Sequence, residues 1–340
     1  MKNRKLGLLV LLLISILLSS CQSYAVDNEQ VSSDEKLIIR FSHVVGEDTP
    51  KGEAARRFAQ LIKERSNGKI EVQVFANGSL YRDGEEYTAL VEGDIQMIAP
   101  AMSKMTDQIT ELQFFDLPFF FSSLDQIHKL ADGKVGELVF ESAKGIGVEP
   151  LAIWDNGFKQ FTSNLSFLTA PDRFQNLTFR IMPSEILSKQ FAVLGAQAEV
   201  RNFNEVYQSI INKEVDGQEN TISNIYTKRF YEVQNYLTLS NHGYLGYLVI
   251  MNQDFWNNLS PEYQELISTT LTEVTLWQRE RAEELQEKQL QYIQQSEKIQ
   301  IRSMTDAEWL SFNELYKPLY AELEQKIGSV FFKQMKALLE

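Results

Sequence analysis

Apolar and polar residues alternate with the period of a β-strand in short segments of the chain, and they recur with the period of a helix between them. A first strand is expected at Lys36–His43, a helix at Gly52–Asn67 and a second strand at 70–74. This order favours parallel strands joined by a crossover helix. The same patterns predict strands at 95–99, 148–154, 177–182, 236–240 and 244–251, helices at 83–92, 123–144, 184–194, 202–213 and 222–233, and a turn-rich segment at 215–220.

The segment Asn176–Gly195 combines a strand with the start and end signals of a helix. Pro183 ends the strand, Ser184 suits the helix N-cap, and Gly195 closes the helix. Arg180 is therefore expected near the carboxyl end of a strand, the edge that faces the ligand crevice in open α/β sheets. A guanidinium there can bind a carboxylate through two parallel hydrogen bonds. The alternative is an arginine in a surface salt bridge.

A single long helix is predicted near the C-terminal end of the chain, at Ser260–Lys298. Ser260 suits an N-cap, Pro261 suits the first helical position, and no glycine or proline interrupts residues 262–298. A helix of 36 residues is ~54 Å long, more than the width of one lobe of this size. The apolar residues keep no sustained heptad, so a strut across two lobes is favoured over a coiled coil.

Two further segments are assigned to packing. Phe114–Phe121 contains five phenylalanines and is expected to lie in the core of the first lobe rather than to form an aromatic binding platform. Thr305–Leu339 is expected to form two helices packed on the second lobe.

The composition is that of a globular protein with length for two lobes: 340 residues, 44% hydrophobic and 23% charged. The net charge of −13 argues against nucleic acid as a partner. His43, His128 and His242 lie far apart, and no HExxH, CxxC, GxSxG, GxGxxG or Walker pattern is present. No metal or other cofactor is therefore expected.

The N-terminus has the pattern of a secretory signal. Three basic residues precede the apolar run Leu6–Leu18, and Ser19 and Ser20 lead directly to Cys21, the only cysteine. We interpret 1–20 as a lipoprotein signal peptide, Cys21 as the lipidation site and 21–35 as a flexible tether. A buried free cysteine or an ordinary cleavage site are the alternatives. Cleavage removes three positive charges and leaves −16.

From about Leu37 onward, the chain resembles the extracytoplasmic solute-binding proteins of tripartite ATP-independent periplasmic (TRAP) transporters, most closely the DctP subgroup that binds four-carbon dicarboxylates. The resemblance is carried by long stretches in the right order: FSHVVGEDTPKG (41–52), DLPFFF (116–121), DNGFKQFTS (155–163), FRIMPSEIL (179–187), FNEVYQSI (203–210), VDGQENTISNIYTKRFYEVQ (215–234) and LSNHGYLGYLVIMNQDFW (239–256).

The resemblance implies an α/β, two-lobed fold like that of periplasmic binding proteins, a Venus flytrap with a long helix spanning both lobes. Lobe 1 is expected to comprise 36–156 with 246–285, and lobe 2 to comprise 157–245 with 286–340. An organic acid would bind between lobes that close on a hinge. The expected protein is a monomeric receptor outside the cytoplasmic membrane, held at the membrane by its lipid, and its partners are the small and large permease subunits.

Four residues of the second lobe match positions that bind substrate in the family. Arg180 matches the shared arginine, Asn220 the asparagine of the D-G-Q-E-N element, and Phe203 the aromatic residue before the E-V-Y helix. Lys159 stands where many members have an arginine in a G-x-R element; lysine there is similar to the dicarboxylate subgroup and departs from the sialic-acid type. The alternatives are that Lys159 is a solvated lysine at a strand edge and that Phe203 only packs at a helix cap.

The first lobe is expected to hold the second carboxylate of the ligand. The loop His43–Lys51 lies where the family contacts the far end of its ligand, so Lys51 and His43 are candidates. His43 as a hydrogen-bonded structural histidine is the alternative. Trp154 and Tyr247 suit either the cleft or the core. The pattern leaves open whether Arg82 and Asp83 form an ion pair across the lobes or within one lobe.

Three other functions compete with a dicarboxylate receptor. The same fold can bind another organic acid, such as a 2-oxo acid, a sugar acid or an aromatic acid. A loaded receptor can also act on a membrane sensor. An enzyme, such as a lyase acting on a carboxylic acid, is disfavoured because the sequence offers no acid–base or metal constellation.

Overall fold

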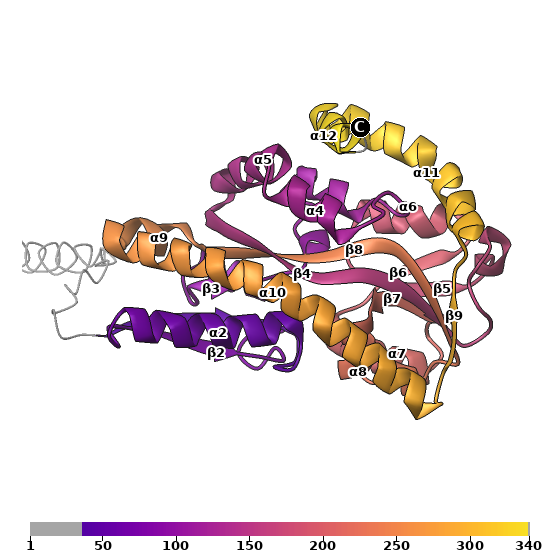
Figure 1. Ribbon diagram of the computed structural model, residues 1–340, viewed down its shortest axis with the longest axis horizontal. Coiled ribbons are helices and arrows are strands. Elements are labelled where there is room, and N and C mark those ends of the chain that lie inside the picture. The colour runs from indigo at the N-terminus through magenta and orange to yellow at the C-terminus, as the bar shows by residue number, and fades with distance from the viewer. Residues whose placement is uncertain (1–35, 339–340) are drawn as a thin grey trace, which may run out of the picture. The chain divides into compact units, whose positions relative to one another are not determined.

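The computed structural model describes residues 36–338; the expected signal peptide, the lipidation site Cys21 and the tether lie outside the described residues. Within this part, a nine-stranded sheet has the order β2-β1-β3-β8-β4-β7-β5-β6, with β9 paired to β8 (Figure 1). The strands are β1 Leu37–Ser42, β2 Ile70–Phe75, β3 Met97–Ile98, β4 Val148–Ser163, β5 Thr178–Ile181, β6 Gln197–Val200, β7 Gly217–Thr221, β8 Tyr236–Asn252 and β9 Gln300–Ser303.

Helices connect these strands and cover the sheet. They are α2 Pro50–Arg65, α3 Glu86–Val91, α4 Leu124–Ala131, α5 Lys134–Ala143, α6 Glu185–Val193, α7 Val206–Ile211, α8 Ile222–Thr227, α9 Gln253–Asn258, α10 Pro261–Ser296, α11 Asp306–Ile327 and α12 Val330–Ala337, with short 3₁₀ helices that include η1 Met102–Lys104, η2 Thr110–Asp116 and η5 Phe203–Glu205. Among the helices of residues 36–338, none is both long and apolar enough to cross a bilayer.

Two long antiparallel strands, β4 and β8, form the centre of the sheet and join two groups of shorter strands. Their pairing runs from Val148↔Asn252 to Ser163↔Tyr236. The first strand group (β2, β1, β3) attaches to one end of this pair, through β3 and β8. The second strand group (β7, β5, β6) attaches to the other end, through β7 and β4. Parallel pairing relates β1 to β3, and β5 to both β6 and β7, so α/β packing is confirmed in each group.

The predicted long helix is confirmed as α10, which has 36 residues and begins at the N-cap Ser260. It lies against α2, β4 and α8, and so passes from the first strand group to the second (Figure 1). Hydrogen bonds fix it to the middle of β4: the Trp154 indole donates to Thr275, and Gln278 exchanges two hydrogen bonds with the backbone of Asp155. The start of α6 at Ser184 is confirmed as well, since the Ser184 hydroxyl accepts from the Leu187 N–H.

Several local predictions are wrong. Residues 215–220 were expected to be turn-rich, but Gly217–Thr221 forms the wholly buried strand β7, because it pairs with both β4 and β5. The segments 236–240 and 244–251 are one continuous strand, β8, since β4 pairs with it along both stretches. The helix expected at 123–144 is divided into α4 and α5.

The two C-terminal helices pack differently from the prediction. α11 lies against α6, but α12 lies against α4 and α5, which precede β4, rather than on the second strand group. Phe331 and Phe332 of α12 both contact Phe114 at ring-centroid distances of 5.5 Å. The phenylalanines of 114–121 therefore form a packing core, as expected, and the C-terminal helix α12 packs against that core.

Candidate functional site

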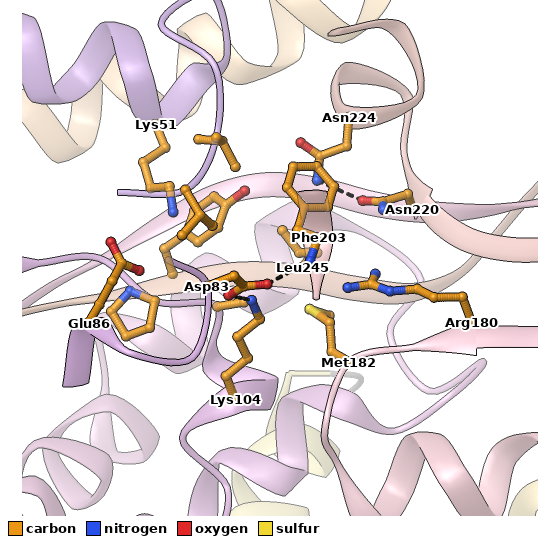
Figure 2. A pocket seen from close by; sticks show the side chains of 15 residues that line it. Lys51, Asp83, Glu86, Lys104, Arg180, Met182, Phe203, Asn220, Asn224 and Leu245 are labelled. Atoms are coloured by element: carbon orange, nitrogen blue, oxygen red, sulfur yellow. Dashed lines mark hydrogen bonds and ion pairs between the residues drawn. The ribbon is translucent and has the colours of Figure 1, made fainter. Parts of the chain in front are cut away.

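A pocket lined mostly by buried residues lies where the two strand groups face each other (Figure 2), and about 400 Å³ in it and at its mouth is free of protein atoms. Its charged residues and asparagines lie at or after the carboxyl ends of strands in both groups, as ligand sites of open α/β sheets do. The lining residues are Val44, Val45, Lys51, Asp83, Glu86, Pro100, Ala101, Lys104, Arg180, Met182, Phe203, Asn220, Asn224, Leu245 and Tyr247.

Arg180 reaches the pocket from the carboxyl end of β5, as the sequence predicted. It is 2% exposed, and its Nε and Nη2 donate to the Arg201 carbonyl at 3.0 and 2.8 Å. A guanidinium has five N–H donors, so further donors remain for a ligand. Burial lowers the pKa of Arg180 to about 10, against the opposing effect of Asp83 and Glu219, so the group is charged at neutral pH. The alternative of a surface salt bridge is wrong.

Lys51 lines the pocket from the first turn of α2. Its ammonium donates to the Ala99 carbonyl at 2.7 Å and lies 3.8 Å from the centroid of the Tyr247 ring. Burial lowers the pKa of Lys51 to about 7, although Glu86 opposes the shift. Tyr247, which the sequence left between cleft and core, therefore belongs to the pocket, where its ring faces a cation.

His43 and Trp154 do not line the pocket. Both are fully buried. Burial, together with the nearby Lys51 ammonium, lowers the pKa of His43 to about 3, so the imidazole is neutral at pH 7. The structure thus brings Lys51 but not His43 to the pocket from the predicted loop.

Asn220 and Phe203 both line the pocket from the second strand group. The Asn220 side-chain oxygen accepts from the Asn224 amide at 2.6 Å, and its amide nitrogen donates to Gln218 at 3.1 Å. One N–H of that amide is left for a ligand. The Phe203 ring lies 4.9 Å from the Lys228 ammonium, and its packing in an apolar cluster with Val206 shows that it also has a structural role.

Lys159 is not among the residues that line the pocket. It is fully buried, and its ammonium lies 2.5 Å from Glu219, whose other oxygen bonds to His242 at 2.9 Å and to Gln190 at 3.1 Å. Burial raises the pKa of Glu219, but Lys159 and His242 outweigh it and lower that pKa to about 2. The interpretation as a solvated lysine is therefore wrong, and the structure places Lys159 of β4 in an ion pair with Glu219 of the neighbouring strand β7.

Three charged residues of the pocket were not predicted as site residues from the sequence: Asp83, Glu86 and Lys104. Lys104 forms an ion pair with Asp83, while the Arg82 side chain is exposed, so Asp83 pairs with Lys104 instead. Glu86 accepts from the Ser42 hydroxyl at 2.9 Å. One signal for Lys104 was available: it is the only charged residue between Gln96 and Thr106, a mainly apolar stretch.

The pocket combines basic side chains with a pair of carboxylates. Three cations, Lys51, Lys104 and Arg180, face two carboxylates, Asp83 and Glu86 (Figure 2). Burial raises the pKa of Asp83, but the Lys104 ammonium outweighs it and lowers that pKa. Burial raises the pKa of Glu86, which Lys51 only partly opposes. Within residues 36–338, no group of three or more His, Cys, Asp or Glu side chains is arranged to hold a metal ion.

Comparison with known proteins identifies the same relatives along nearly the whole chain. The sequence profile of DctP, bacterial extracellular solute-binding protein, family 7, matches residues 41–326. The C4-dicarboxylate-binding protein DctB of Bacillus subtilis is 40% identical over 312 residues, 92% of this chain and 89% of that protein. The C4-dicarboxylate-binding periplasmic protein DctP of Rhodobacter capsulatus is 38% identical over 304 residues, 89% of this chain and 91% of that protein.

The fold is likewise matched by solved structures. A TRAP periplasmic solute-binding protein from Shewanella oneidensis, crystallised with bound succinate, superposes with a TM-score of 0.86 at 36% identity. The match covers 89% of this chain and 99% of that one. The expected two-lobed α/β architecture is confirmed by this likeness.

Proposed function

Because the chain belongs to the DctP family, the bacterial extracellular solute-binding proteins of family 7, we propose that it is the solute receptor of a TRAP transporter and binds a four-carbon dicarboxylate such as succinate, malate or fumarate. Membership in this family makes it a receptor rather than an enzyme. The observation that carries the proposal is a buried pocket with three cations, Arg180, Lys51 and Lys104, in a chain of net charge −13. The ligands named for its relatives support it.

The cations of the pocket match the charge of the ligand. Burying two carboxylates without partners costs several kcal/mol each, and the overall negative charge of the protein repels a dianion. One carboxylate would bind the planar fork of Arg180, assisted by the Asn220 amide. The other would extend toward Lys51 on the opposite side of the pocket, where the Lys104 ammonium adds to the local positive potential (Figure 2). Lys159 would act indirectly, because its ion pair with Glu219 holds β7 in place and so positions Asn220 on the same strand.

Binding would be coupled to closure of the two lobes. A ligand held by Arg180 recruits Lys51 from the other strand group, so it favours the closed form. Shifting the lobes from 1:99 to 99:1 in favour of closure requires ~5.5 kcal/mol of differential binding. Two or three charge-assisted hydrogen bonds, at ~1.5–3 kcal/mol each, can supply this. The closed form would then be recognised by the small and large permease subunits.

The proposal also includes a division into two lobes, a monomeric state and a lipid anchor. Lobe 1 would comprise 36–156 with 246–285 and lobe 2 would comprise 157–245 with 286–340, a division supported by the two strand groups, although α12 packs against α4 and α5. The receptor would be a monomer, anchored outside the cytoplasmic membrane by a lipid on Cys21.

A second ligand class is favoured by the two carboxylates of the pocket. Asp83 and Glu86 accept hydrogen bonds, so they suit the hydroxyl groups of a sugar acid or another hydroxylated organic acid.

Calorimetry on residues 27–340 tests the proposal, with succinate, malate and fumarate titrated beside pyruvate, a sialic acid and a hexuronate. We expect saturable one-to-one binding of the three dicarboxylates alone. Binding of only a monoacid would keep Arg180 as the anchor but contradict the dicarboxylate assignment. No binding across the panel would contradict the function proposed for this pocket.

A further inference from the structure

The Asp83 carboxylate connects the two strand groups beside the pocket. Asp83 lies in the loop 76–85, between β2 and α3, and is 6% exposed. Its Oδ2 accepts from the backbone N–H of Phe203 at 2.7 Å, and its Oδ1 forms the ion pair with Lys104 (Figure 2). Phe203 opens η5 directly after β6, so this hydrogen bond joins segments that are 120 residues apart. One side chain therefore ties a cation of the first group to the backbone of the second.

Two glycines of the loop that carries Asp83 also lie close to side chains of the segment 202–204. Gly78 has a φ of +67°, and a Cβ added to it would lie 3.3 Å from the Asn204 side-chain amide. Gly84 has a φ of +93°, and a Cβ there would lie 4.0 Å from the Asn202 side-chain oxygen. Positive φ values favour glycine, so the loop is shaped to bring Asp83 to the segment 202–204.

An apolar contact joins the two strand groups next to this hydrogen bond. Val44 and Val45, which follow β1, are buried in one cluster with Phe203, Val206 and Ile210 of the second strand group. These contacts exist only while the two groups are together. A polar bond at the edge of such a contact adds directional specificity, because it is made in one arrangement of the two groups and lost in the other.

We propose that Asp83 is an interlobe latch: its hydrogen bond to the Phe203 N–H forms on closure, stabilises the closed form and slows release of the ligand. The inference rests on the proposed function in one respect, since it takes the two strand groups to be lobes that separate to admit a ligand. In the open form, Asp83 keeps its ion pair with Lys104 but loses its hydrogen bond to the Phe203 N–H. The latch therefore acts on the closing equilibrium, and it changes the dissociation rate more than the association rate.

A competing explanation is that Asp83 only positions Lys104. The substitution Lys104→Met distinguishes the two explanations, because it removes the ion pair with Asp83 and leaves the Phe203 N–H in place. An asparagine at position 83 can still accept from that N–H in this background, whereas an alanine cannot. The comparison of Asp83→Asn with Asp83→Ala, both combined with Lys104→Met, therefore isolates the hydrogen bond.

The measurement is the succinate dissociation rate by stopped flow on the full mature chain. We expect Asp83→Ala with Lys104→Met to release succinate about tenfold faster than Asp83→Asn with Lys104→Met, with association rates that differ by less than about threefold. Both double variants lack the Asp83 charge, so only the hydrogen bond to the Phe203 N–H distinguishes them. Equal dissociation rates for the two double variants would overturn the latch. Asp107→Asn, at an exposed aspartate outside the pocket, is the matched control.

A second readout does not depend on the ligand. Spin labels on cysteines placed at Lys63 of α2 and Ile211 of α7, both exposed, report the distance between the two strand groups. We expect Asp83→Ala to shift the distribution toward the longer distance, with and without succinate, while Asp107→Asn leaves it unchanged. An unchanged distribution would overturn the latch even if succinate binds. A wild-type protein that fails to bind succinate would contradict the proposed function, yet the label distances would still test the latch.

Discussion

The Arg180 guanidinium donates through both Nε and Nη2 to the backbone carbonyl of Arg201, at 3.0 and 2.8 Å. The strands β5 and β6 pair in parallel, with Arg180 opposite Glu199, so this carbonyl lies just beyond the end of the neighbouring strand. The bonds fix the plane of the guanidinium before any ligand arrives. A preorganised fork loses less rotamer entropy on binding, which is the advantage of arginine over lysine at this position.

Substitution of Arg180 should abolish tight binding without unfolding the protein. Arg180→Ala removes two charge-assisted hydrogen bonds to the ligand, each worth ~1.5–3 kcal/mol, so we expect the dissociation constant for succinate to rise more than about 100-fold. Arg180→Lys should also bind poorly, because a lysine cannot hold the Arg201 carbonyl and a carboxylate with the same fixed geometry. Calorimetry gives the affinity, and thermal denaturation shows whether the variant is folded.

The matched control for this substitution is Arg173→Ala, which removes an exposed arginine that does not line the pocket. It should bind succinate with wild-type affinity. If Arg180→Ala also retains that affinity, Arg180 is not the ligand anchor.

Binding should weaken as the pH rises, because Lys51 has a pKa lowered to about 7 by burial. The sign follows from the charge: below pH 7 the free pocket holds a lysine that is already cationic, whereas above pH 7 a proton must be taken up when a dianion binds. We expect the affinity for succinate to fall by about tenfold per pH unit above 7, as for uptake of one proton. Calorimetry between pH 6 and 9, in buffers of different ionisation enthalpy, measures both the affinity and the proton uptake.

Lys51→Met is the control for this pH dependence. It should bind weakly at every pH and lose most of the slope. A slope that persists in Lys51→Met would assign the proton to another group of the pocket, such as Glu86, whose pKa burial raises.

Lys159 should contribute to stability more than to ligand contact. Lys159→Met leaves Glu219 buried without its ammonium partner, and breaking a buried ion pair in this way costs ~3–5 kcal/mol. Chemical denaturation should show that loss, while the folded fraction should bind succinate within about tenfold of wild type, since no hydrogen bond to the ligand is lost. The double variant Lys159→Met with Glu219→Gln should recover part of the stability. A loss of affinity above about 100-fold, with unchanged stability, would restore Lys159 as a ligand contact.

The sequence and the structure agree where local signals determine the element. Ser184 and Gly195 delimit α6, and Ser260 begins α10, because capping residues act within a few positions of themselves. They disagree at β7, since 215–220 has the composition of a turn and becomes a strand only through pairing with both of its neighbours. In the site, Arg180 was predictable from its place at a strand end. The ion pairs of Lys104 and Lys159 were not, because Asp83 and Glu219, their partners, are distant in sequence. Only the isolated position of Lys104 in an apolar stretch pointed to that residue.

Gly157 should be required where β4 passes between the two strand groups. It has a φ of +107°, and the register of β4 against β8 shifts between Asp155 and Gly157. An alanine there would be forced into a backbone conformation that costs ~1–3 kcal/mol, and its Cβ would meet the side chain of Gln286 on α10. We expect Gly157→Ala to lower the free energy of unfolding by that amount in chemical denaturation. Gly145→Ala, at a position with no atom within 4 Å of the added Cβ, should change it by less than about 0.5 kcal/mol. Equal stability of the two variants would show that the irregularity in β4 adapts freely to a side chain, and so is not a fixed element of the connection between the strand groups.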